Sequence, residues 1–180
     1  DKVARTIYIE DVIIRPESYG IKNLKSVNKA QVEAKTLIVD IGGGTTDIAI
    51  FNEKNKFIDG ESLDIGLLEL YHNVKKYISM KYCKISLEDA KKVFDGEIKM
   101  INIQDYSFLK EFQDDFMNKL LNEFKGSFPS AISCNLILAG GGGEIGIDYF
   151  EKEYPQTILV NDIGVNAKAF RLMGLKKWQK

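Results

Sequence analysis

Three adjacent glycines and two threonines follow the first strongly apolar run of the chain and could bind an anion: Gly42, Gly43, Gly44, Thr45 and Thr46. Glycine has no Cβ and reaches positive φ readily, so the backbone N–H groups of such a turn can approach phosphate oxygens. Asp40 ends the apolar run beside the turn, and Mg²⁺ prefers one or two carboxylates together with phosphates and waters. The stretch therefore predicts a phosphate-binding turn with a metal-binding carboxylate at its edge. Asp47 can cap this turn or act as a second acid.

The segments on either side of the glycines indicate how a phosphate would be bound. Residues 37–41 and 48–51 are both apolar and rich in β-branched side chains, which predicts a strand, a turn and a second strand. In a Rossmann or P-loop site the glycines open a helix, and the composition of 48–51 argues against a helix there. A hairpin without a ligand is the alternative, but three adjacent glycines cost more conformational entropy than a structural turn needs.

A second glycine cluster follows the apolar run 135–139: Gly140, Gly141, Gly142 and Gly143. The backbone there must come close to something flat or anionic, and Glu144 follows in a predicted helix that continues through Phe150 and ends before Pro155. Gly141, Gly143 and Gly146 also fit the GxGxxG fingerprint of a dinucleotide-binding Rossmann domain, with Asp162 after the next apolar run. That alternative leaves the first glycine hairpin unexplained.

The order of residues from Asp40 to Asp47 resembles the second phosphate motif of the ATPase superfamily that contains actin, heat-shock chaperones and sugar kinases. Gly140, Gly141 and Gly142 are similar to the adenosine motif of the same superfamily, with Glu144 following as in ParM-like sequences. The resemblance implies ATP or GTP and Mg²⁺ as ligands, with Asp40 both catalytic and metal-binding.

Two further site residues are implied by the resemblance. The stretch 15–17 resembles the segment that in ParM-type plasmid-segregation actins supplies the group orienting the attacking water, which gives Glu17 a catalytic role. Taken alone, Glu17 is equally an exposed acid in the first turn of a helix. Residues 88–91 resemble a short helix that contacts adenine and ribose in chaperone-type relatives, which implies adenosine-binding roles for Glu88 and Lys91. The same pair also fits a solvated helix face.

The remaining elements follow from hydrophobic periodicity and from helix start and stop signals. A third strand at 57–63 would complete an antiparallel meander, and a later strand is expected near 157–160. Helices are expected at 64–82, at 86–96 with Ser86 and Gly96 as caps, from 105 or 107 to 125, and at 163–174 with Gly174 as its cap, followed by a frayed tail at 176–180. Residues 6–14 look β-rich, 22–35 look like a helix end with a surface loop, and 97–103 like a strand or extended connection.

Composition excludes several classes of function. The chain has 180 residues with 44% hydrophobic content, and its 25 Lys and Arg balance 26 Asp and Glu, so direct binding to nucleic acid has no electrostatic basis. No apolar run approaches membrane-spanning length, which favours a cytoplasmic protein with no membrane partner. Cys83 and Cys134 lack metal or disulfide spacing, and His72 is the single histidine, so we expect neither a disulfide nor a histidine metal site.

These observations predict an α/β fold, the C-terminal half (domain II) of an actin-like, ribonuclease H-like ATPase. We expect a mixed sheet in which an antiparallel three-strand meander is followed by parallel strands, with helices on both sides. Residues 1–63 and 127–180 would form the nucleotide-binding core with helix 105–125 packed on it, and residues from about 64 to 104 an inserted lobe. The first phosphate hairpin of the superfamily has no counterpart and the chain starts without Met, so we expect a fragment that lacks the N-terminal half.

The function implied is that of a bacterial filament-forming ATPase, nearest to the ParM/StbA type that partitions plasmids. Such a protein would self-associate into filaments when full-length and reach DNA only through an adapter protein. The alternatives are a non-filamentous ATPase or kinase of the same fold, a nucleotide-binding module without turnover, and the Rossmann domain described above. The fragment alone is expected to be inactive.

Overall fold

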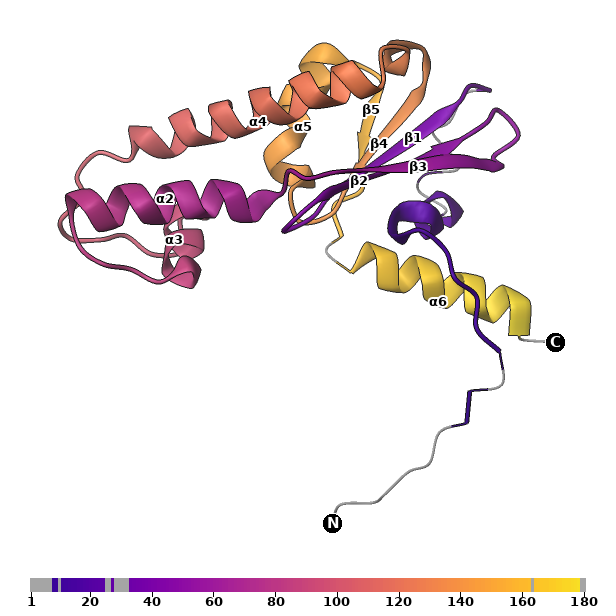
Figure 1. Cartoon of the computed structure of the whole chain (residues 1–180), viewed down its shortest axis with the longest axis horizontal. Coiled ribbons are helices and arrows are strands. Elements are labelled where there is room, and N and C mark those ends of the chain that lie inside the picture. Colours follow the sequence, from indigo (N-terminus) through magenta and orange to yellow (C-terminus); the bar gives the residue numbers. More distant parts are fainter. Residues whose placement is uncertain (1–7, 10, 25–26, 28–32, 163, 179–180) are drawn as a thin grey trace.

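A computed structural model describes residues 8–9, 11–24, 27, 33–162 and 164–178. Figure 1 shows a twisted sheet with helices on both faces and a helical lobe that extends from one edge. The sheet has five strands in the order β3-β2-β1-β4-β5, with bounds β1 Thr36–Ile41, β2 Thr46–Phe51, β3 Phe57–Leu63, β4 Asn135–Ala139 and β5 Thr157–Leu159. The first three strands form the predicted antiparallel meander, and β1, β4 and β5 are parallel.

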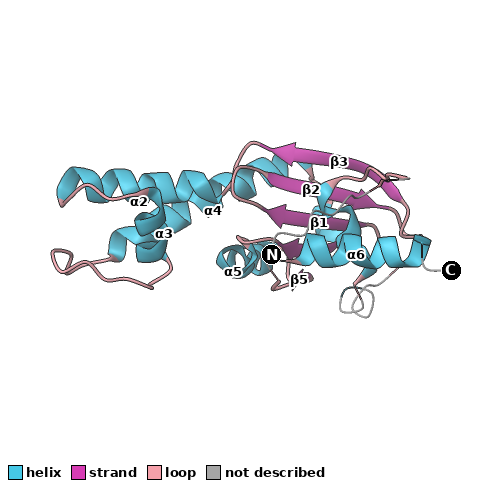
Figure 2. Ribbon diagram, turned by 90° about the horizontal axis from the view of Figure 1, so that it is seen from below, coloured by secondary structure: helices cyan, strands magenta, loops and turns pink. Residues whose placement is uncertain are grey.

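Strand β1 is buried along its whole length because both faces of the sheet are covered. On one face Leu37, Val39 and Ile41 pack against α4 (Ser107–Ser127) and α5 (Gly143–Glu153). On the other face Ile38 belongs to a second core, which the short 3-10 helix η1 (Glu17–Asn23) and helix α6 (Val165–Trp178) complete. Figures 1 and 2 show the two helix layers on opposite sides of the strands. The mixed sheet and its two layers confirm the predicted fold class.

The lobe consists of α2 (Leu67–Lys81), α3 (Leu87–Phe94) and the first half of α4, which share a separate apolar cluster. Helix α4 joins both cores, because Phe108 lies in the lobe cluster and Phe124 in the sheet cluster. The predicted caps of α3 are present: Ser86 and Asp89 form a reciprocal capping box, and Gly96 has φ +75°. Figure 2 shows how far the lobe extends beyond the sheet.

Several local predictions were wrong. The described residues of the expected β-rich segment 6–14 form no strand, and Tyr8, Ile9 and Ile14 are exposed because no neighbouring strand pairs with them. Residues 97–103 form no strand, which leaves the other expectation for this segment, a connection without regular structure apart from a turn at 101–102. Helix α6 continues through Gly174 to Trp178, because Gly174 does not adopt the positive φ with which a glycine ends a helix.

Segment 22–35 lies partly outside the described residues. In its described part η1 ends at Asn23 and Val27 is buried in the second core. No helix in the described part of the chain is both long and apolar enough to cross a membrane.

Candidate functional site

The glycine turn between β1 and β2 is a tight hairpin whose exposed tip is free for a ligand. The Gly42 N–H donates to the Thr45 carbonyl at 2.9 Å and closes the turn, so this donor is not available to a phosphate. Gly43 and Gly44 are exposed, and within the described residues their N–H groups donate to no protein acceptor. The Thr45 hydroxyl donates to Asp47 Oδ2 at 3.0 Å. The part of the turn that can receive an anion is therefore 43–45.

Thr46, the fifth residue predicted to bind phosphate, has a different environment. Its side chain is fully buried, and its hydroxyl donates to the Ile65 carbonyl at 2.8 Å. This bond links the start of β2 to the segment after β3, so Thr46 stabilises the base of the turn and does not face a ligand. A β-strand places successive side chains on opposite faces, which is why adjacent threonines have different surroundings.

Gly66, which the sequence analysis missed, fixes the turn against the lobe. The Leu67 N–H donates to the Gly42 carbonyl at 3.0 Å, and the Leu68 N–H donates to the Gly43 carbonyl at 2.8 Å. The first free N–H groups of α2 are thus satisfied by the glycine turn. A Cβ at Gly66 would lie 2.4 Å from the Gly43 carbonyl oxygen, so this close approach requires glycine. A glycine directly before a predicted helix was the available signal.

Asp40 lies at the end of β1 with only 6% of its surface exposed. Asn166, in the first turn of α6, donates from Nδ2 to Asp40 Oδ2 at 2.6 Å. Burial raises the pKa of Asp40, and the nearby negative charges of Glu17 and Asp47 raise the pKa further, while the bond from Asn166 lowers it. A carboxylate held in this way favours a neighbouring cation, which would offset both the burial and the repulsion.

Glu17 begins η1 on the face of the sheet opposite α4 and is exposed. It lines a hollow of about 430 Å³ together with Asp47, which lies opposite Asp40 in the hairpin register. The structure therefore brings Glu17, Asp40 and Asp47 to one edge of the sheet, although the first two are distant in sequence. Their combined charge makes this edge acidic and suited to a cation.

The second glycine cluster packs directly against the end of β1, next to the first cluster in the chain. Because β1 and β4 are parallel neighbours, the loop after β4 lies beside the end of β1. Gly140 has φ +81°, and a Cβ there would lie 2.1 Å from Asp40 Oδ1. A Cβ at Gly142 would lie 2.3 Å from the Ile41 side chain, and the Gly142 N–H donates to the Ile41 carbonyl at 3.0 Å. Gly140 and Gly142 are therefore needed for close packing, whereas Gly141 is exposed.

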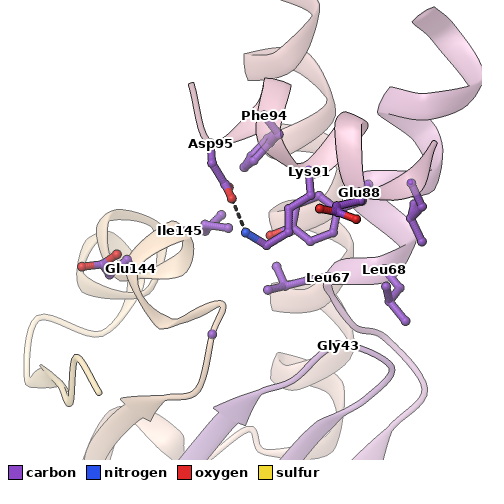
Figure 3. A pocket seen from close by; sticks show the side chains of 12 residues that line it. Gly43, Leu67, Leu68, Glu88, Lys91, Phe94, Asp95, Glu144 and Ile145 are labelled. Atoms are coloured by element: carbon purple, nitrogen blue, oxygen red, sulfur yellow. Dashed lines mark hydrogen bonds and ion pairs between the residues drawn. The ribbon is translucent and has the colours of Figure 1, made fainter. Parts of the chain in front are cut away.

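A cavity of about 830 Å³ opens between this loop and the lobe, as Figure 3 shows. Five predicted site residues line it: Gly43 of the first glycine turn, Gly141 and Glu144 of the second, and Glu88 and Lys91 of α3. The other lining residues are mostly apolar: Leu67, Leu68, Tyr71, Leu87, Phe94, Asp95 and Ile145. An apolar cavity with a few polar groups at its rim is typical of a site for a flat organic ring.

The polar groups of the cavity have protein partners. Lys91 forms an ion pair with Asp95 one helical turn away, drawn as a dashed line in Figure 3. Glu88 pairs with Lys92 at 2.6 Å, and Glu144 accepts a hydrogen bond from Asn161. Glu88 and Lys91 approach from α3, and Glu144 from α5 on the other side of the opening. These contacts leave the apolar walls as the main source of affinity for a ring.

The chemistry of the acidic edge fits Mg²⁺. Among the described residues no three His, Cys, Asp or Glu side chains are grouped so as to hold a metal ion. Mg²⁺ does not need such a cage, since it commonly binds through one carboxylate and takes its other ligands from phosphates and waters. Asp40, beside the open turn at 43–45, is a carboxylate that could fill this role.

Neither a comparison with protein-family models nor one with curated protein sequences finds a match. Solved structures give a clear result. An archaeal actin homologue, Ta0583 in complex with ADP, superposes with a TM-score of 0.78 at 20% identity over 91% of this chain and 57% of its own. The chain has an actin-like fold. Its antiparallel glycine hairpin and mixed strand order exclude the Rossmann alternative, and the segment at Gly141, Gly143 and Gly146 is not a dinucleotide fingerprint.

Two bacterial proteins share the actin-like fold. A ParM filament from Clostridium botulinum matches with a TM-score of 0.77 and 20% identity, over 96% of this chain and 56% of the ParM chain. MreB5 of Spiroplasma citri, bound to AMPPNP, matches with a TM-score of 0.70 and 17% identity, over 89% of this chain and 59% of its own. The chain thus spans a little more than half the length of these actin-like structures.

Proposed function

We propose that this chain is the nucleotide-binding half of an actin-like ATPase. The nucleotide base would occupy the cavity between α3 and α5, and the phosphates of ATP or GTP would reach the turn 43–45, with Mg²⁺ held through Asp40. One observation carries the proposal: the phosphate turn, the buried carboxylate and the apolar cavity lie at the same edge of the sheet. The solved structures with ADP and with AMPPNP support nucleotide as the ligand class.

The residues of the chain would divide the work as follows. The N–H groups of Gly43 and Gly44 hold phosphate oxygens, and the Thr45 hydroxyl would add a donor by exchanging its hydrogen bond to Asp47 for one to the phosphate. Asp40 anchors the metal, which supplies charge neutralisation for phosphoryl transfer when bound. Glu17, on the opposite side of Asp40 from the cavity, orients the attacking water. The rim groups Glu88, Lys91 and Glu144 determine how the base and ribose sit.

We further propose that residues 1–63 and 127–180 form the core of this half and that 64–104 form its inserted lobe. An N-terminal half with the first phosphate hairpin would close the site from the other side. The match covers just over half of each solved neighbour, which supports the proposal that a second half completes the protein. We place the protein in the cytoplasm.

Filament formation is the proposed activity of the whole protein, and plasmid partitioning its proposed role. The similarity to a ParM filament supports assembly, while the similarity to MreB5 and to an archaeal homologue leaves partitioning as the more specific part of the proposal. Contact with DNA would need an adapter, because the chain has a net charge of −1. Electron microscopy of the full-length protein with and without ATP tests assembly. A monomer with ATP turnover would favour a non-filamentous ATPase or kinase of this fold.

The 180-residue chain alone should bind ATP weakly and hydrolyse it negligibly. Catalysis of phosphoryl transfer requires donors and metal on several sides of the phosphates, and this chain surrounds only one side. Charges that face bulk water interact weakly. Calorimetric titration with ATP and a phosphate-release assay, each run beside the full-length protein, measure the difference. Hydrolysis by the chain at the rate of the full-length protein would contradict the two-half proposal.

Glu17→Ala in the full-length protein should slow hydrolysis by about 100-fold or more and change nucleotide affinity little. A group that orients water acts mainly in the transition state, and general-base groups contribute on the order of 100-fold to 10,000-fold. Single-turnover hydrolysis and equilibrium binding of ADP give the two quantities. Asp59→Ala is a matched control, because Asp59 is an exposed acid lining the same hollow. Equal losses of binding and turnover would show that Glu17 is structural.

A further inference from the structure

Asn166 makes a specific contact to Asp40 across the fold. The two residues are 126 positions apart, and the bond from Asn166 Nδ2 to Asp40 Oδ2 is short, at 2.6 Å. Asn166 lies in the first turn of α6, on the face of the sheet opposite the helices that form the cavity. It therefore contacts the carboxylate from the side of the sheet opposite the cavity, and it lines neither the cavity nor the phosphate turn.

The other end of the same amide is unsatisfied. Asn166 Oδ1 is buried and has no hydrogen-bond partner among the described residues. A buried acceptor without a partner is destabilising, and leucine, which is similar in size, would avoid that cost. A flipped amide would direct oxygen at the Asp40 carboxylate, so the donating orientation is the consistent one. The bond to Asp40 is thus the feature that an asparagine provides at this position and an apolar side chain does not.

This bond limits how the carboxylate can rotate. Oδ2 is held by Asn166, and Oδ1 lies against the backbone at Gly140, where even a Cβ would come within 2.1 Å. Mg²⁺ requires near-ideal octahedral geometry, so a fixed carboxylate binds it better than a rotating one. Mutation of a group that orients a metal ligand through a hydrogen bond typically lowers metal affinity or activity by about 10-fold to 100-fold.

Helix α6 also supports the segment that carries Glu17. A Cβ at Gly20 in η1 would lie 2.8 Å from the Cβ of Ala169, so the two helices are in close contact. Asn166 and Ala169 lie one turn apart on α6, which places both contacts on one face of the helix. The same helix therefore contacts the Asp40 carboxylate and the middle of η1, the element that Glu17 begins.

We propose that Asn166 is a positioning residue, which fixes the Asp40 carboxylate for the metal ion. It lies on α6, the helix that also packs against η1, the element that Glu17 begins. This inference rests on the proposed function, since it concerns the metal that the Asp40 site would hold. The proposal gives α6 a role in metal binding, although no residue of α6 lines the cavity.

The test is Asn166→Leu in the full-length protein, which removes the donor and also removes the unsatisfied oxygen. Titration of Mn²⁺ by electron paramagnetic resonance in the presence of ADP should give a dissociation constant about 10-fold to 100-fold higher than in the wild type. The affinity for ADP in chelator should be unchanged. Lys168→Ala is the control, because Lys168 is exposed on the same helix and pairs with Asp162. It should match the wild type in Mn²⁺ affinity.

The outcomes separate the inference from the proposed function. If the wild-type protein shows no Mn²⁺ binding that depends on ADP, the proposed function itself is wrong. If the wild type binds Mn²⁺ with ADP and Asn166→Leu binds it equally well, only the positioning role is overturned. Asn166→Ala, which merely shortens the side chain, provides the same comparison if the leucine variant does not fold.

Discussion

Asp40→Asn should abolish metal-dependent hydrolysis by the full-length protein and at the same time make the nucleotide-free protein more stable. Turnover should fall by at least about 100-fold, because the metal loses its protein carboxylate and each 1.36 kcal/mol of lost transition-state stabilisation is about tenfold in rate. Phosphate release measured over a range of Mg²⁺ concentrations gives this effect. Asp59→Asn is the matched control, since Asp59 is an exposed acid on β3. Near-normal turnover in Asp40→Asn would overturn the metal assignment.

The gain in stability follows from the sign of the pKa shift. Burial and the charges of Glu17 and Asp47 raise the pKa of Asp40 in the folded chain, so folding favours the protonated form. The contribution of Asp40 to stability is therefore fully present below its unfolded pKa and is lost as pH rises through the folded pKa. Above the folded pKa the wild type carries a buried charge that asparagine lacks. Thermal unfolding in chelator should show a midpoint a few degrees higher for Asp40→Asn, with the difference vanishing toward acidic pH.

Gly66→Ala should be strongly destabilising and should also weaken nucleotide binding. The added Cβ would meet the Gly43 carbonyl oxygen at 2.4 Å and the Gly44 carbonyl carbon at 2.5 Å, and both are backbone atoms that cannot rotate away. Relief requires the turn to separate from α2, which breaks the hydrogen bonds from Leu67 and Leu68. Overpacking with backbone shifts costs about 1–3 kcal/mol, and each lost bond adds about 1 kcal/mol. Urea unfolding of the 180-residue chain measures this loss.

Two glycines provide the controls for Gly66→Ala. Gly126 lies within α4 with no atom near the position of an added Cβ, so Gly126→Ala should stabilise the chain by about 0.5–1 kcal/mol. Gly44 also has open space and lacks positive φ, so Gly44→Ala should leave folding stability nearly unchanged while adding a methyl group at the proposed phosphate site. If Gly66→Ala were as stable as the wild type, the close contact between turn and lobe would be wrong.

The glycine hairpin, the meander and the caps of α3 could be predicted because they depend on neighbours in sequence. Side chains at 37–41 and 48–51 and the glycines between them specify a local structure, and Ser86 and Asp89 form their capping box three residues apart. The grouping of Gly43, Glu88 and Glu144 around one cavity agrees with the resemblance to the actin superfamily, although periodicity alone would not have joined them.

What the sequence did not reveal depends on contacts between distant segments. Asn166 looks like any polar residue of a helical first turn until the fold brings it to Asp40. Gly66 looks like a loop residue until α2 meets the glycine turn. Conversely Gly42, Thr46 and Gly142 were predicted to face a ligand, and the structure uses them for closing the hairpin and packing the two loops together. Residue type indicated that a close approach occurs but did not tell which atom is approached.

The hydrogen bonds from α2 to the glycine turn couple the orientation of the lobe to the conformation of the turn. Helix α2 has 15 residues and is therefore about 22 Å long, so a tilt of about 5° at its first turn displaces its far end by roughly 2 Å. Two of the carbonyl groups that hold its first turn, those of Gly42 and Gly43, belong to the peptide units that would face a terminal phosphate. Any reorientation of these peptides on loss of a phosphate would therefore be amplified at the far end of the lobe, where Met80 and Tyr82 are exposed to any neighbouring molecule.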